Sequence, residues 1–130
     1  MKLRLFFAVL LAQVLSMAAY AFDAKIGGIY YKFHGGEAEV TYQSENFNDY
    51  SGEITIPTSV TYNDNTYVVT SIGVAAFYGC SGLTAINIPE GVTSIGWEPF
   101  RDCNHLERFY VKKGSKALLA IWQAGYNKTH

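Results

Sequence analysis

The stretch IGVAAFYGCSGLTAINI (residues 72–88) returns in altered form as IGWEPFRDCNHLERFYV (residues 95–111), with a constant offset of 23 in the numbering (95 − 72). Apolar and small residues recur at equivalent positions, in the pairs Ile72/Ile95, Gly73/Gly96, Phe77/Phe100, Cys80/Cys103, Leu83/Leu106, Ile86/Phe109 and Ile88/Val111. A fixed period in the twenties is typical of coils that stack into a solenoid, because one coil cannot bury its apolar face alone. The pattern therefore predicts a mostly β repeat fold.

A degenerate third copy precedes these two. The segment EITIPTSV (53–60) matches AINIPEGV (85–92) with an offset of 32 (85 − 53), which exceeds the regular period by nine (32 − 23). An insertion at residues 62–70 accounts for the difference, and its NDN tripeptide predicts a turn between two strands. The repeat region, residues 53–111, then holds about 2.5–3 coils of roughly 23 residues, near the minimum that buries a continuous core. The strands expected in register carry the pairs Ile54/Ile56, Ile86/Ile88 and Phe109/Val111.

The residues shared by the copies have structural explanations. Five of them are expected in the core, with Leu83, Ile86 and Ile88 on the strand side and Phe77 and Cys80 on the opposite wall. Gly73 and Gly96 are expected to allow tight turns with positive φ. Pro57 and Pro89 are expected to end their strands, where a missing N–H donor costs little.

Residues 22–52 are interpreted as an N-terminal β-hairpin cap. The runs IYYKF (29–33) and AEVTY (38–42) are rich in β-branched and aromatic residues or alternate in polarity, and HGG between them is a turn. The end of a stacked sheet leaves backbone groups unpaired, and natural proteins cover such edges. We therefore expect this hairpin to cover the first coil.

Residues 112–130 are interpreted as a C-terminal helical cap. Ser115 is a suitable N-cap for a helix at residues 116–124. Leu118, Ile121 and Trp122 share one helical face, which is expected to cover the last coil because a solenoid needs a covered end. A helix that binds a partner is the alternative interpretation.

Residues 1–21 have the features of a secretory signal peptide. Lys2 and Arg4 precede an apolar run at residues 5–14, and AYA at residues 19–21 is typical of a cleavage site. The run is shorter than the about 20 residues that a membrane span needs, so a retained anchor is the less favoured alternative. No cysteine follows the motif directly, so we expect no lipid anchor. The sequence thus predicts a secreted, cell-surface or periplasmic protein without stable membrane insertion after cleavage.

The chain that follows the predicted cleavage site, residues 22–130, has a length that suits one domain. Without Lys2 and Arg4 the chain has 10 − 2 = 8 basic and 11 acidic residues, a net charge of −3, which gives no sign of a nucleic-acid partner. The last segment is more basic, since residues 101–130 hold Arg101, Arg108, Lys112, Lys113, Lys116 and Lys128 against Asp102 and Glu107. A solvated end is the favoured interpretation, and a charged binding face is the alternative.

Cys80 and Cys103 occupy the same position of consecutive coils. Stacked coils place such residues about 5 Å apart, so a disulfide is geometrically possible and is common in exported proteins. We favour two buried free thiols, because the repeat position calls for small apolar residues and explains both cysteines. The spacing is poor for a metal site.

The run V-T-S-I-G-x-x-x-F-x-x-C-x-x-L-x-x-I-x-I-P, here residues 69–89 and reopened by VTSIG at residues 92–96, resembles the BspA-like leucine-rich repeat family. The resemblance covers about residues 53–111. It implies a short leucine-rich-repeat solenoid in an exported or surface protein of the kind found in gut and oral Bacteroidetes. Some members attach to host matrix proteins or to other bacteria, so the resemblance implies protein binding or adhesion.

No set of residues predicts catalysis. The three histidines, His34, His105 and His130, are scattered, and none lies in a nucleophile elbow, a zinc signature or a phosphate-binding loop. An enzyme needs a base, a nucleophile and an orienting group in one place. We therefore expect neither an enzyme nor a cofactor or metal site.

The candidate binding face is the outward row of the strands, formed by Glu53, Thr55, Ala85, Asn87, Arg108 and Tyr110. Solenoids commonly bind along such faces, and tyrosine and arginine are typical interface anchors. The expected partner is a protein or glycan of the host matrix or of a bacterial surface, and not a nucleic acid. The alternative is a small structural or remnant repeat domain that has no binding face of its own and is able to self-associate.

Overall fold

The computed structural model describes residues 22–44 and 50–123 of the chain. The predicted signal peptide, residues 45–49 and the end of the predicted C-terminal cap lie outside the described residues. The elements in chain order are β1 (Ala24–Ile26), β2 (Ile29–His34), β3 (Glu37–Thr41), β4 (Gly52–Thr55), β5 (Ser59–Tyr62), β6 (Asn65–Ile72), β7 (Leu83–Ile88), β8 (Ser94–Ile95), β9 (Arg108–Val111) and α2 (Lys116–Gln123). This content confirms the predicted mostly β class. In the described part of the chain, no helix has the length and apolar character needed to cross a membrane.

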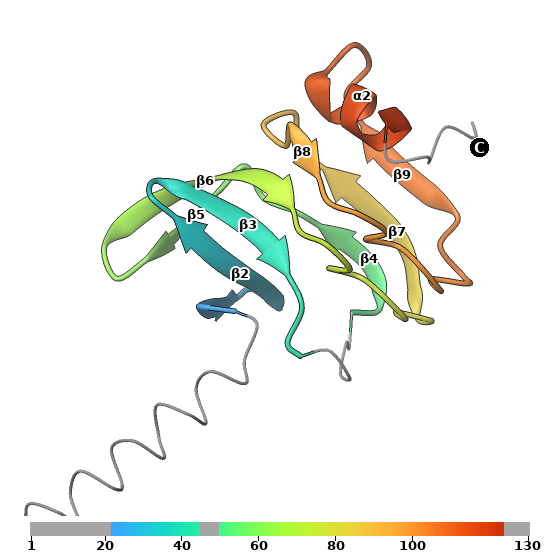
Figure 1. The fold of residues 1–130 in the computed structure, drawn as a ribbon, viewed down its shortest axis with the longest axis horizontal. Helices are drawn as coiled ribbons and strands as arrows, with labels where there is room; N and C mark the ends of the chain where they lie inside the picture. The colour runs from blue at the N-terminus through green and yellow to red at the C-terminus, as the bar shows by residue number, and fades with distance from the viewer. Residues whose placement is uncertain (1–21, 45–49, 124–130) are drawn as a thin grey trace, which may run out of the picture.

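Two sheets form the walls of the molecule (Figure 1). One is three-stranded, in the order β4-β7-β9, and all its pairings are parallel. Its register places Ile54 beside Ile86 and Ile86 beside Phe109, as the sequence offsets of 32 and 23 predict. The predicted stacking of these three strands is therefore confirmed.

The second sheet has six strands, in the order β1-β2-β3-β6-β5, with β8 also paired to β6. The pairing between β6 and β8 is short and consists of the pairs Ser71/Ser94 and Ile72/Ile95. Backbone bonds then continue between the coils beyond the strands, from Phe77 N to Pro99 O and from Gly79 N to Arg101 O, both at 2.8 Å. The coils are thus joined on both walls.

The insertion in the first coil is the hairpin of β5 and β6. Its two turn residues, Asn63 and Asp64, have φ angles of 49° and 63°, which suits a two-residue hairpin turn. On its other edge β6 pairs in parallel with β3, and β3 pairs in an antiparallel manner with β2. The hairpin of β2 and β3 lies where the sequence predicts one, and it extends the second wall beyond the first coil.

The core lies between the two walls and contains a ladder of aromatic rings. Successive ring centroids are 4.7, 5.4 and 5.1 Å apart along the series Tyr50, Phe77, Phe100 and Phe109. Tyr50 follows a polar stretch of sequence, yet it is buried and packs against Phe77. Its hydroxyl donates to Thr41 O at 2.8 Å and accepts from Tyr30 N at 2.9 Å. These bonds tie the ladder to β2 and β3.

The expected reason for Gly73 and Gly96 is wrong, because neither residue has a positive φ. The structure shows that space is the constraint. A Cβ atom on Gly96 would lie 2.5 Å from Val74 N, and one on Gly73 would lie 3.1 Å from the Glu39 Cδ atom. Gly96 therefore lets the last coil approach the backbone of the middle coil, and Gly73 lies close to β3.

Helix α2 lies beside β8 at the end of the stack (Figure 1). Leu118 N donates to Ser115 Oγ at 3.2 Å, which confirms the predicted N-cap. Of the predicted buried face, Ile121 is buried and Leu118 is half-buried, but the expectation for Trp122 is wrong, because Trp122 is 51% exposed and Ala117 and Ala120 are buried instead. Two alanines at the contact let the helix approach closely, and this arrangement turns Trp122 toward solvent.

Candidate functional site

The three-stranded sheet brings the six predicted site residues onto one face in two rows. The first row is Glu53, Ala85 and Arg108, and the second is Thr55, Asn87 and Tyr110. Each row takes one residue from β4, β7 and β9, because the strands are parallel and in register. The alternation of a strand sends the intervening residues, such as Ile86, into the core. We call these six residues the outward face.

Ala85 is a correction to the predicted face, because it is fully buried. It is the shortest side chain of the outward face and lies on the central strand, between Glu53 and Arg108. Its methyl group is flanked by longer side chains on both sides and offers no accessible surface. The first row therefore presents one acidic and one basic residue, separated by a gap.

The β4 side of the outward face is a small polar network. The Asn87 side-chain amide donates to Glu53 Oε1 at 2.8 Å and to Thr55 Oγ1 at 3.2 Å. Asn87 is half-buried, whereas Glu53 and Thr55 are exposed. Because its donors are already used by the neighbouring strand, Asn87 orders this side of the face rather than offering an amide to a ligand.

The β9 side of the outward face is an exposed pair of one arginine and one tyrosine. The Arg108 guanidinium carbon lies 6.0 Å from the centroid of the Tyr110 ring, a distance at which a cation and an aromatic ring attract each other. Tyr110 is 43% exposed. The pair combines a planar cation with an aromatic surface and a hydroxyl group, the chemistry that protein interfaces use most for anchoring.

An open groove of about 500 Å³ adjoins this pair at the carboxyl ends of the three strands. Its walls are the polar residues Thr55, Asn87, Tyr110 and Lys112 and the apolar residues Ile56, Ile88, Pro89, Phe109 and Val111. Beside it, Lys112 Nζ forms an ion pair with Glu90 Oε2 at 3.0 Å. The groove thus offers apolar contact next to a positive charge.

The groove is not predicted by the sequence, although Ile88 is buried as expected; Ile56 is also buried and Val111 is half-buried. The signal was present in the strand-ending prolines, Pro57 and Pro89. Parallel strands that end at equivalent positions bring their last residues to one edge of the sheet, where the interior opens.

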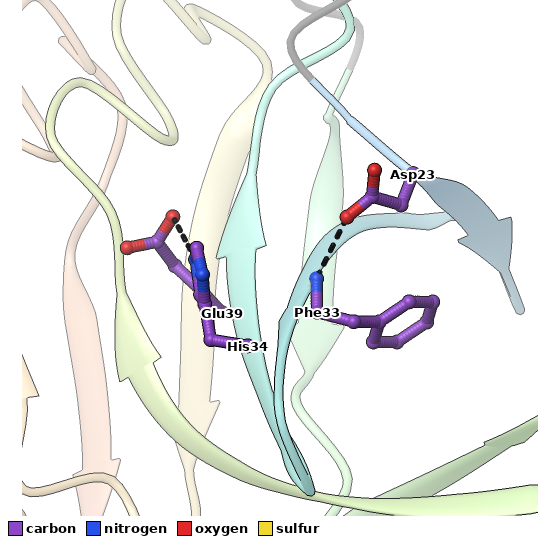
Figure 2. Close-up of polar contacts among 4 residues, drawn as sticks. All are labelled: Asp23, Phe33, His34 and Glu39. Atoms are coloured by element: carbon purple, nitrogen blue, oxygen red, sulfur yellow. Dashed lines mark hydrogen bonds and ion pairs between the residues drawn. The ribbon is translucent and has the colours of Figure 1, made fainter.

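The histidines have structural partners away from this face. His34 Nε2 lies 3.9 Å from Glu39 Oε2, and nearby Phe33 N donates to Asp23 Oδ2 at 2.8 Å (Figure 2). His105 Nδ1 donates to the carbonyl oxygen of Ser81 at 2.8 Å, which ties the last coil to the one before it. His130 lies outside the described residues. In the part of the chain that the structure describes, no three histidine, cysteine, aspartate or glutamate residues are grouped so that they could hold a metal ion.

Cys80 and Cys103 remain thiols in the structure, as the sequence analysis favoured. Cys80 is buried and Cys103 is half-buried, and the Cys103 thiol donates to Phe77 O at 2.9 Å. The hydrogen bond with the Cys80 side chain lowers the pKa of Cys103, and burial opposes that shift. The two thiols therefore belong to the contact between coils.

Comparisons with known proteins agree with this geometry. The family model described as "BspA type Leucine rich repeat region (6 copies)" matches residues 53–119. A crystal structure of a leucine-rich repeat protein from Bacteroides ovatus is similar, with 40% identity, a TM-score of 0.62, and coverage of 72% of this chain and 24% of that protein. A leucine-rich cell surface protein from Faecalibacterium prausnitzii has 28% identity and a TM-score of 0.59, over 71% of this chain and 24% of that protein.

A leucine-rich repeat protein from Bacteroides capillosus has 30% identity and a TM-score of 0.57, over 67% of this chain and 63% of that protein. The chain thus spans about a quarter of the length of the first two structures and less than two thirds of the third. Among curated proteins, none matches the chain.

Proposed function

This chain belongs to the BspA-type leucine-rich repeat family, and we propose that it is an exported, surface-exposed module that binds a protein through its outward face. The family fold supports an interaction role, since repeat solenoids present extended surfaces for binding. The predicted signal peptide supports export, as does the description of the Faecalibacterium prausnitzii protein as a cell surface protein. The expected partner is a protein of the host matrix or of a bacterial surface, with a surface glycan as the alternative ligand.

One observation carries this proposal, namely the pairing of Arg108 and Tyr110 beside the open groove. Two large side chains of this kind, stacked on each other and exposed, lose less conformational freedom on binding than two mobile ones. The apolar groove residues next to them, such as Ile88 and Val111, can accept an apolar side chain of a partner. The site therefore has an anchor pair and an adjoining hollow, as a hot spot in a protein interface has.

The proposal is tested by binding of the purified chain to arrays of host matrix proteins, bacterial surface proteins and glycans. Against any protein that binds, the double variant Arg108→Ala/Tyr110→Ala is expected to lose about thirtyfold in affinity, which corresponds to removal of one strong hot spot. Surface plasmon resonance measures the dissociation constants.

The matched control is Tyr78→Ala, because Tyr78 is 42% exposed and so resembles Tyr110 in exposure, but it does not belong to the outward face. This control is expected to bind as the unmodified chain does. An equal loss of affinity for Tyr78→Ala and for the double variant, or full affinity in the double variant, would remove the outward face as the binding site.

A further inference from the structure

Strand β9 is an edge of the three-stranded sheet and is bonded on one side only. The sheet order is β4-β7-β9, and in the residues that the structure describes no strand pairs with β9 other than β7. Ile56 N donates to Asn87 O at 3.0 Å, so the Asn87 peptide group faces β4 and those of Ile86 and Ile88 face β9. Because Ile86 pairs with Phe109 in a parallel register, it bonds to Arg108 and Tyr110, the residues on either side of Phe109. The peptide groups of Phe109 and Val111 therefore face the open edge.

The open edge therefore offers two N–H donors and two C=O acceptors in the geometry of a strand. Such a row is a template for the backbone of another extended chain. On the inner side of the same edge, Phe109 and Val111 are only half-buried. An added strand would satisfy the backbone groups and cover these two apolar side chains.

The charged residues around the β9 edge indicate which side chains a partner strand would carry. Arg108 lies on the outward side of β9, and Lys112 and Lys113 follow the strand directly, with Lys112 paired with Glu90 at 3.0 Å. The opposite edge of the sheet, on β4, carries Glu53 at the position equivalent to Arg108. Of these two edges, the β9 edge therefore favours acidic side chains, through Arg108 and Lys113.

We propose that β9 binds an extended segment of a partner protein as a fourth strand, and that this segment alternates acidic and apolar residues. The acidic residues lie outward against Arg108 and Lys113, and the apolar residues lie inward against Phe109 and Val111. This edge shares Arg108 with the outward face but binds through the backbone of β9, so the backbone tests below are independent of the proposed function. Pairing of β9 with a second copy of this chain is the competing occupant.

Hydrogen exchange of backbone amides, measured by NMR, tests the proposal with two short blocked peptides. One alternates glutamate and valine, and its matched control alternates lysine and valine. The glutamate peptide is expected to slow exchange at Phe109 and Val111 by about tenfold or more, the effect of a formed hydrogen bond, with little change at Arg108 and Tyr110. Equal protection by the lysine peptide, or none by either peptide, overturns the proposal. Protection of both amides in the peptide-free chain, lost on dilution, assigns the edge to self-pairing and also overturns it.

A pair of variants separates backbone docking from side-chain docking. Val111→Ala keeps the N–H group at the open edge, whereas Val111→Pro removes it, and proline is tolerated where the N–H faces away from the sheet. Val111→Pro is expected to bind the glutamate peptide about tenfold more weakly than Val111→Ala, the effect of one lost backbone bond. Thr55→Ala and Thr55→Pro are the matched controls on the β4 edge, and both are expected to bind as the unmodified chain does. Equal binding by the two Val111 variants overturns the proposal.

A charge variant gives a result even if the proline variant does not fold. Arg108→Glu is expected to weaken binding of the glutamate peptide about tenfold and to strengthen binding of the lysine peptide, because like charges now meet at the edge. Unchanged preference between the two peptides contradicts the charge assignment.

Discussion

The middle coil (residues 72–88) and the last coil (residues 95–111) repeat the same pattern, yet they differ in burial. Leu83 is fully buried and its counterpart Leu106 is half-buried, and the same contrast holds for Ile86 and Phe109. The residue types are closely similar, so the difference comes from position. Burial in a solenoid is supplied by the neighbouring coils, and the repeat sequence alone does not determine it.

The strand pairings show the cause of this difference. In the middle coil, β7 lies between β4 and β9. In the last coil, β9 has one neighbouring strand in the described residues. The middle coil is therefore built for stability, and the last coil keeps the side chains and backbone groups that a partner can use.

The largest expected effect tests this contrast at one leucine of each coil. Leu83→Ala is expected to lower the free energy of unfolding by about 3 kcal/mol, because it leaves a cavity in a fully buried site. Leu106→Ala is expected to cost about 1 kcal/mol, because the half-buried side chain has less surface to lose and its site is open to water. Urea unfolding, followed by circular dichroism, measures both values. Equal losses would show that the last coil is as well packed as the middle one.

Alanine substitutions of the two glycines are expected to have smaller effects on stability. Here the larger loss is expected in the last coil, at Gly96, and not in the middle coil. Gly96→Ala is expected to cost about 2 kcal/mol, because its Cβ would press on backbone atoms of residues 73 and 74 that cannot move aside. Gly73→Ala is expected to cost less, about 1 kcal/mol, because its Cβ would lie 3.1 Å from the flexible Glu39 side chain and 3.2 Å from the Val40 backbone oxygen, contacts that are less close than those at Gly96. The same urea experiment distinguishes the two. A larger loss at Gly73 would contradict the close approach of the last coil to the middle one.

The repeat fold and the residues of its outward face follow from the sequence. The repeat offsets, 23 and 32 in the numbering, place Ile54, Ile86 and Phe109 in one row, and alternation then puts Glu53, Asn87 and Tyr110 on the other side of the sheet. These are rules of period and register, and a single sequence contains them. The protein-binding role of that face stays a proposal.

Other features depend on packing between distant segments and could not be read from a period. Tyr50 lies in a polar stretch, yet it completes the aromatic ladder because β3 and the first coil leave a space under Phe77. Ala85 is buried by longer side chains on neighbouring strands, whereas alternation assigned it only a direction. Trp122 is exposed because Ala117 and Ala120 fit the contact better, and helical periodicity could not choose between the two faces.

The smallest expected effect is a difference in reactivity between the two cysteine thiols, and it leaves stability unchanged. At pH 8, iodoacetamide is expected to alkylate Cys103 before Cys80, because Cys103 is half-buried and Cys80 is buried. The lowered pKa of Cys103 also gives it more reactive thiolate at this pH. Peptide mass spectrometry measures the two rates, and Cys103→Ser shows whether Cys80 reacts alone in the folded chain.

The pH profile of that reaction separates exposure from acidity. The Cys103 rate is expected to reach half its plateau at a lower pH than that of an ordinary cysteine, because the hydrogen bond with the Cys80 side chain lowers the pKa of Cys103. In Cys80→Ala that bond is lost, so the profile is expected to move to higher pH while Cys103 stays accessible. An unshifted profile in Cys80→Ala would show that exposure alone makes the last coil reactive. A shifted profile would show that Cys80 of the middle coil lowers the pKa of Cys103 in the last coil through their contact.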